Sequence, residues 1–267
     1  MKAVILAAGR GSRLQRVTGA LPKCLARIGG VTLIERQMRA IVSCGMTDIV
    51  VVTGHCAADV RRVCGGAVTF VHNNRFASTN SLYSLWLARE CLTDGFVVFN
   101  CDVLFHTQLL RDLMTCRYED ALLASSTAPD GGYSAEEMKL RVRSGCVVEV
   151  SKSIEGSDAD GENVGIARFS STGASVLLEE MQELVSEGVT TAWLPAAFDR
   201  YCRRRPLHVV DNRGFPWIEI DSPDDYWRAC TSVLPALDEI ETLVRSDRAG
   251  AIRDNEARRA WSVTRHV

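Results

Sequence analysis

The chain begins with MKAVILAAGRGSRL (residues 1–14), in which an apolar run from Ala3 to Ala8 leads directly into a loop of two glycines and two arginines. A short, continuously apolar run is typical of a buried strand. Gly9 and Gly11 allow the backbone to adopt positive φ and to approach a ligand closely. Successive amide N–H groups in such a loop can form an anion-binding nest. The stretch therefore predicts a strand that ends in a phosphate-binding loop.

Strands and helices alternate after this loop, which predicts an α/β fold. We expect apolar strands at 48–54, 67–71 and 96–102, and helices between them at 32–45, 57–64 and 78–92. Such strands with helical crossovers are typical of a parallel sheet covered on both faces. The second half adds a hairpin around Ser144-Gly145, strands at 162–170, 207–211 and 217–221, and helices at 172–188, 190–205 and from Ser222. We therefore predict a mostly parallel, mixed sheet with helices on both faces.

The whole-chain composition excludes several classes of protein. The formal net charge of −2 gives no indication of a nucleic-acid or membrane partner. No apolar run approaches the ~18 residues of a membrane span, and the first run is too short for a signal peptide, so we expect a cytoplasmic protein. Ten cysteines are scattered without a Cys-x-x-Cys pair, and we interpret them as reduced and structural. We expect one domain over 1–237 and a helical tail or linker over 238–267.

Fixed positive charge accompanies the N-terminal loop. Arg13 offers a planar fork for phosphate oxygens, and Lys23 follows Pro22 ten residues later. A P-loop is absent, and Leu14 breaks a G-x-G-x-x-G motif. The compound pattern of Leu-Ala-Ala-Gly-x-Gly-x-Arg-Leu followed by Pro-Lys indicates a phosphate-binding site. The alternative is a tight turn with solvated arginines.

Three acidic residues lie within predicted strands, at or near their ends. Asp102 ends the strand at 96–102, where an aspartate can also serve as a turn or cap residue. Glu219 and Asp221 lie two residues apart on an extended segment, so their side chains face the same side. The alternative for this pair is a solvated strand face.

These motifs resemble the bacterial nucleotidyltransferase (pyrophosphorylase) family. Residues 73–92 and 96–105 look like the helix and metal-binding aspartate of CTP:phosphocholine and CTP:phosphonate cytidylyltransferases, and 217–229 looks like their closing acidic motif. The resemblance covers residues 1–230. It implies a Rossmann-like three-layer sandwich of the nucleotide-diphospho-sugar transferase type.

The resemblance also implies a set of site residues. Asp102 and Asp221 would hold Mg²⁺ with Glu219 as a near neighbour, and Arg13 and Lys23 would hold the leaving phosphates. Two lysines of the hairpin, Lys139 and Lys152, would clamp the acceptor, and the alternative is a basic hairpin in solvent. The implied nucleotide-binding residues are Leu6, Ala7, Ala8, Gly9, Gly11, Asn80, Ser81 and Cys101. Helix capping alone would equally explain Asn80 and Ser81.

The leading hypothesis is a Mg²⁺-dependent cytidylyltransferase that joins CMP from CTP to a small phosphonate or phospho-alcohol. The acceptor would resemble 2-aminoethylphosphonate or phosphocholine, and pyrophosphate would be released. The alternatives are a sugar-1-phosphate nucleotidyltransferase that uses UTP or dTTP, a non-catalytic nucleotide-binding module, and a glycosyltransferase. The tail at 238–267 would either pack on a second subunit or lead to a fused downstream domain.

Overall fold

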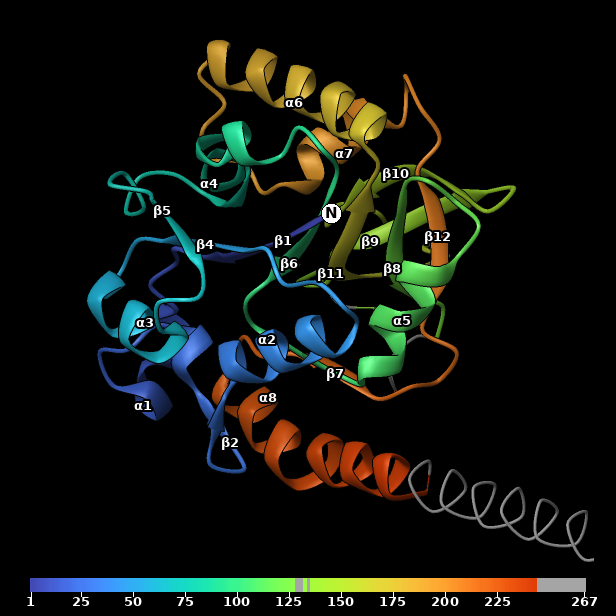
Figure 1. Ribbon diagram of the computed structural model, residues 1–267. Helices are drawn as coiled ribbons and strands as arrows, with labels where there is room; N and C mark the ends of the chain where they lie inside the picture. The colour runs from blue at the N-terminus through green and yellow to red at the C-terminus, as the bar shows by residue number, and fades with distance from the viewer. Residues whose placement is uncertain (128–131, 134, 244–267) are drawn as a thin grey trace, which may run out of the picture.

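A mixed β-sheet forms the centre of the molecule (Figure 1). The computed structural model describes residues 1–127, 132–133 and 135–243. Among these residues, nine strands lie side by side in the order β5 (Thr69–His72), β4 (Ile49–Thr53), β1 (Lys2–Ala7), β6 (Phe96–Asn100), β11 (Gly161–Phe169), β8 (Ala121–Ser125), β12 (His208–Asp211), β10 (Cys146–Ser151) and β9 (Lys139–Arg143).

The sheet changes direction at β11. Strands β5, β4, β1 and β6 are parallel to one another. Strand β11 then runs antiparallel to both β6 and β8, and β12 runs parallel to β8. The N-terminal half is thus the predicted parallel unit, and the later strands extend it into the predicted mixed sheet.

Helices cover both faces of the sheet, which gives three layers (Figure 1). One face packs against α4 (Ser81–Leu87), α6 (Ser171–Ser186) and α7 (Pro195–Tyr201). The other packs against α2 (Leu33–Ser43), α3 (Ala57–Cys64) and α5 (Thr107–Thr115). Alternate residues of β1 explain the arrangement, because Val4 and Leu6 join the first core and Ala3 and Ile5 the second. The predicted α/β sandwich is confirmed.

A smaller ladder lies beside the main sheet and carries part of the candidate site. Strand β7 (Val103–Phe105) pairs antiparallel with β13 (Trp217–Glu219), with Val103 opposite Glu219. Ser222 then caps α8 (Pro223–Arg228) through a capping box with Asp225. The remaining short elements are η1 (Ser12–Leu14), α1 (Gln15–Thr18), η2 (Lys23–Leu25), β2 (Arg27–Ile28), β3 (Val31–Thr32), η3 (Arg89–Cys91), η4 (Gly156–Asp158) and the π-helical η5 (Ala229–Val233).

Two parts of the chain differ from the sequence expectation or extend beyond it. Residues 103–125, for which the sequence pattern was not assigned, supply β7, α5 and β8. The expected boundary at residue 237 falls within a helical stretch that continues through residue 243. Residues 244–267 of the predicted tail lie outside the described residues.

Candidate active site

The N-terminal loop lies directly against Lys23. Gly11 has φ +64°, and a Cβ atom at this position would lie 2.5 Å from Cγ of Lys23. A side chain at position 11 would therefore displace the lysine as well as strain the backbone. Gly9 is not among the glycines with positive φ. The positive φ that the sequence suggested for both glycines is therefore found at Gly11 and not at Gly9.

Two acidic segments that are far apart in sequence meet at this loop. Asp102 follows β6 and precedes β7, and the pairing of β7 with β13 brings Glu219 beside it. The amide N–H of Ile220 donates to the backbone carbonyl of Asp102 at 2.9 Å. One carboxylate oxygen from each of Asp102, Glu219 and Asp221 lies within 4.8 Å of the others. The three predicted acidic residues thus form one carboxylate cluster.

Burial and mutual repulsion perturb the pKa values of the carboxylate cluster. Burial, with repulsion from Asp102 and Asp221, raises the pKa of Glu219 to about 8. Burial also raises the pKa of Asp102 despite the nearby charge of Lys23. At Asp221 burial acts in the same direction, but attraction to Lys23 and Arg13 outweighs it and lowers the pKa. A positive charge among these oxygens would relieve the repulsion.

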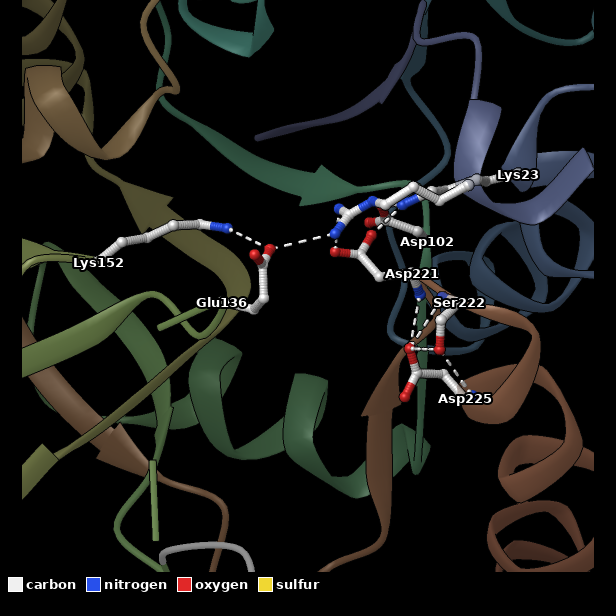
Figure 2. Close-up of polar contacts among 8 residues, drawn as sticks. Lys23, Asp102, Glu136, Lys152, Asp221, Ser222 and Asp225 are labelled. Atoms are coloured by element: carbon white, nitrogen blue, oxygen red, sulfur yellow. Dashed lines mark hydrogen bonds and ion pairs between the residues drawn. The ribbon is translucent and has the colours of Figure 1, made fainter. Parts of the chain in front are cut away.

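Basic side chains neutralise part of this negative charge (Figure 2). Nζ of Lys23 lies 3.3 Å from Oδ2 of Asp102 and also donates to Oδ1 of Asp221. Arg13 donates to Oδ2 of Asp221 at 2.5 Å and to Oε2 of Glu136 at 3.1 Å. Lys152 lies 3.5 Å from the same oxygen of Glu136. The two predicted phosphate-binding cations are therefore the counter-ions of the carboxylate cluster.

A cavity opens above these groups and is lined by most of the residues that the sequence singled out. The predicted residues that line it are Leu6, Ala8, Gly9, Gly11, Arg13, Lys23, Asn80, Ser81, Cys101, Asp102, Lys152, Glu219 and Asp221. Ala7 is placed elsewhere, since its side chain points into the core on the α2 side of the sheet. The loop, the acidic segments and the hairpin therefore share one cavity.

Lys139 is also placed away from the cavity wall. Its side chain is 2% exposed, and it pairs in register with Glu162 of β11. Burial and the charge of Glu137 raise the pKa of Glu162 to about 7, although Lys139 opposes the shift. The hairpin thus contributes Lys152, and not a pair of lysines, to the cavity.

Asn80 and Ser81 serve the local structure and also face the cavity. Oδ1 of Asn80 accepts from the backbone N–H of Ser81 at 2.8 Å, and Oγ of Ser81 accepts from the N–H of Leu194 at 2.8 Å. Both residues line the cavity. Capping of α4 occupies the oxygen of Asn80, and the contact with Leu194 occupies that of Ser81. Contact with a ligand is open to the remaining surface of the two side chains.

Several cavity residues were not anticipated from the sequence. Glu136 lies before β9 in a segment without a recognisable motif, yet it contacts both Arg13 and Lys152. Phe76 lines the cavity beside the N-terminal loop, with the guanidinium carbon of Arg10 5.6 Å from its ring centroid. The stretch that contains Phe76 carried the family resemblance, but no property of that residue alone pointed to the site.

Comparison with known proteins identifies a domain family that matches the N-terminal part of the chain. Residues 3–134 match the family described as "MobA-like NTP transferase domain". Residues 3–134 are thus similar to an NTP transferase domain. The matched residues include the N-terminal loop, Lys23 and Asp102 and end before Glu219 and Asp221. In the folded chain, Glu219 and Asp221 lie beside Asp102 of the matched segment.

Curated relatives carry transferase names. The chain is 31% identical to "Bifunctional IPC transferase and DIPP synthase" of Rubrobacter xylanophilus over 84% of this chain and 50% of the relative. It is 35% identical to "Choline-phosphate cytidylyltransferase" of Streptococcus pneumoniae over 44% of this chain and 52% of the relative. It is 31% identical to "CMP-5'-(3-aminopropyl)phosphonate synthase" of Streptomyces rubellomurinus over 60% of this chain and 23% of the relative. The predicted relationship to nucleotidyltransferases, near the phosphocholine and phosphonate cytidylyltransferases, is confirmed.

A solved structure shows the same fold. The inositol-1-phosphate CTP transferase from T. maritima superposes with a TM-score of 0.73 at 22% identity, over 90% of this chain and 96% of that chain. The chain spans about half the length of the first two curated relatives and less of the third. Within the described residues, no helix combines the length and apolar character needed to cross a bilayer.

Proposed function

We propose that this protein is a Mg²⁺-dependent cytidylyltransferase that transfers CMP from CTP to a small phosphonate or phospho-alcohol and releases pyrophosphate. The observation that carries the proposal is the carboxylate cluster of Asp102, Glu219 and Asp221, which lies beside Arg13 and Lys23 at the end of β1. The choice of CTP is supported by relatives that are named cytidylyltransferase or CMP-phosphonate synthase.

The carboxylate cluster fits a hard divalent cation. Its three ligand oxygens lie within 4.8 Å of one another, and carboxylates with water and substrate phosphate are the ligands that Mg²⁺ prefers. Burial and mutual repulsion raise the pKa of Glu219 to about 8, and a cation bound among these oxygens would favour its charged form. When bound, Mg²⁺ would supply positive charge against the α-phosphate and the incoming anion.

The cationic side chains would hold the triphosphate. Arg13 is paired with Asp221, and Lys23 with Asp102. In the nucleotide complex we expect both to leave the carboxylates and bind the β- and γ-phosphates. They would then stabilise pyrophosphate as it departs, which is electrostatic stabilisation by preorganised groups. Gly11 lets the loop approach this same point.

The acceptor would enter from the side of Lys152. An oxygen of its phosphate or phosphonate attacks the α-phosphorus, a new P–O bond forms, and the bond from the α-phosphorus to the bridging oxygen breaks. A phosphate monoester is largely a dianion at neutral pH, so the site needs no general base. Lys152 lies 4.9 Å above the ring of Trp193 and contacts Glu136. We expect Lys152 to exchange Glu136 for the anionic group of the acceptor.

The test is pyrophosphate release with each of the four nucleoside triphosphates. Each would be paired with 2-aminoethylphosphonate, phosphocholine, inositol-1-phosphate or glucose-1-phosphate in the presence of Mg²⁺. Release with CTP and a phosphonate or phospho-alcohol supports the proposal. Turnover confined to UTP or dTTP with a hexose phosphate would replace it with a sugar nucleotidyltransferase. No release in any pairing would leave a nucleotide-binding module.

A further inference from the structure

A buried glutamine lies under the turn that carries Asp102. Gln37 belongs to the buried face of α2, between Ile34 and Ile41, and is 2% exposed. Its Nε2 donates to the backbone carbonyl of Asn100 at 2.8 Å and to that of Val103 at 2.9 Å. The single amide group therefore contacts both ends of the turn between β6 and β7.

The chemistry of the two partners fixes the orientation of this amide. Carbonyl oxygens only accept hydrogen bonds, so the NH₂ group must face them and both of its hydrogens are used. Among the described residues, Oε1 of Gln37 has no hydrogen-bond partner. A buried acceptor without a partner is unfavourable. An apolar side chain at position 37 would avoid this cost. The advantage of glutamine over an apolar residue is therefore the two hydrogen bonds that it donates.

The turn that Gln37 holds contains Asp102. Asn100 is the last residue of β6 and Val103 is the first residue of β7, so Asp102 lies between the two bonded carbonyls. On the opposite side, the N–H of Ile220 donates to the carbonyl of Asp102 at 2.9 Å. The backbone on both sides of the carboxylate is thereby tied to α2 and to the segment that follows β13.

We propose that Gln37 is a positioning residue that sets the Asp102 carboxylate for cation binding. This inference rests on the proposed function, because it takes the carboxylate cluster to be a divalent-cation site. Groups that orient metal ligands through hydrogen bonds typically change metal affinity or activity by about 10–100-fold when they are replaced. Gln37 contacts neither the cavity nor the carboxylates, and acts through the backbone of the turn.

The experiment measures Mn²⁺ binding by electron paramagnetic resonance and calorimetry in the presence of CTP, without acceptor. The variants are Gln37→Met, which keeps the volume and removes both donors, and Gln37→Glu, which keeps the shape. Ile41→Val is the matched control, since it removes one buried methyl group from the same helix. Asp102→Asn tests whether the carboxylate cluster binds the cation. The melting temperature of each variant is recorded in parallel.

We expect Gln37→Met to weaken Mn²⁺ binding by about 10–100-fold while Ile41→Val stays within about twofold of the parent. Gln37→Glu should also weaken Mn²⁺ binding, because a carboxyl group can donate to at most one of the two carbonyls. This variant serves as the test if Gln37→Met does not fold. Binding by a folded Gln37 variant within twofold of the parent, or equal weakening by Ile41→Val, would overturn the inference.

The same data separate this inference from the proposed function. If Asp102→Asn binds Mn²⁺ as the parent does, the carboxylate cluster is not the cation site and the proposed function loses its basis. If Asp102→Asn loses Mn²⁺ but Gln37→Met does not, the cation site stands and only the role of Gln37 is wrong.

Discussion

Replacing Lys23 with methionine should have opposite effects on metal binding and on turnover. Lys23 lies 3.3 Å from Asp102 and also bonds Asp221. A divalent cation must therefore compete with the lysine for the same oxygens. Coulomb's law gives the first contact about 1 kcal/mol in bulk water and about 5 kcal/mol at an effective dielectric constant of about 20. Without nucleotide, Lys23→Met should consequently bind Mn²⁺ at least about tenfold more tightly.

The same substitution should slow catalysis. If Lys23 moves to the departing phosphates, its loss removes a preorganised charge worth about 3–4 kcal/mol of barrier. Turnover of CTP, measured by pyrophosphate release, should then fall by about 10²–10³-fold. Lys2→Met is the matched control, because Lys2 pairs with Asp48 at 3.9 Å at the opposite end of β1. Unchanged or weaker Mn²⁺ binding in a folded Lys23→Met protein would refute the competition argument.

Three further outcomes follow from the site geometry. Asp102→Asn should lower turnover at least about 100-fold and shift the melting temperature by less than about 3 °C; retained activity would exclude Asp102 as a metal ligand. Lys152→Met should raise KM for the acceptor about tenfold and leave KM for CTP unchanged, whereas Lys139→Met should lower the melting temperature without that effect on KM. The raised pKa of Glu219, about 8 against an ordinary 4.5, means that the folded protein binds more protons than the unfolded chain across this interval. The free energy of unfolding of the metal-free protein should therefore fall as pH rises from about 5 to about 8, and chemical denaturation of Glu219→Gln should show a smaller decline.

Features that depend on local sequence were predictable. The N-terminal loop, Lys23 and Asp102 each follow a strand or a proline within a few residues, and parallel strands place such segments at one edge of a sheet. Glu219 and Asp221 were found because residues two apart on an extended segment share a face. The structure brings all of these to one cavity.

Features that depend on strand register and on contacts between distant segments were not predictable. Lys139 pairs with Ser151 in the hairpin, so Met138, one residue earlier, reaches the cavity and Lys139 faces the opposite side. Alternation along the strand places Met138 and Lys139 on opposite faces. Which of the two faces the cavity can be predicted only when the strand register is known. Gln37 and Glu136 act on residues 63 and more positions away, and no local pattern marks such a contact.

The pairing of β7 with β13 has a consequence for synthesis on the ribosome. Residues 103–105 are translated more than a hundred residues before their partners at 217–219, and β11 must enter the sheet between β6 and β8. A nascent chain that has emerged only as far as residue 134 contains the matched family segment, yet it lacks two of the three carboxylates. Such long-range pairing also slows folding. The growing polypeptide thus cannot assemble this cavity until residues 217–221 have left the exit tunnel.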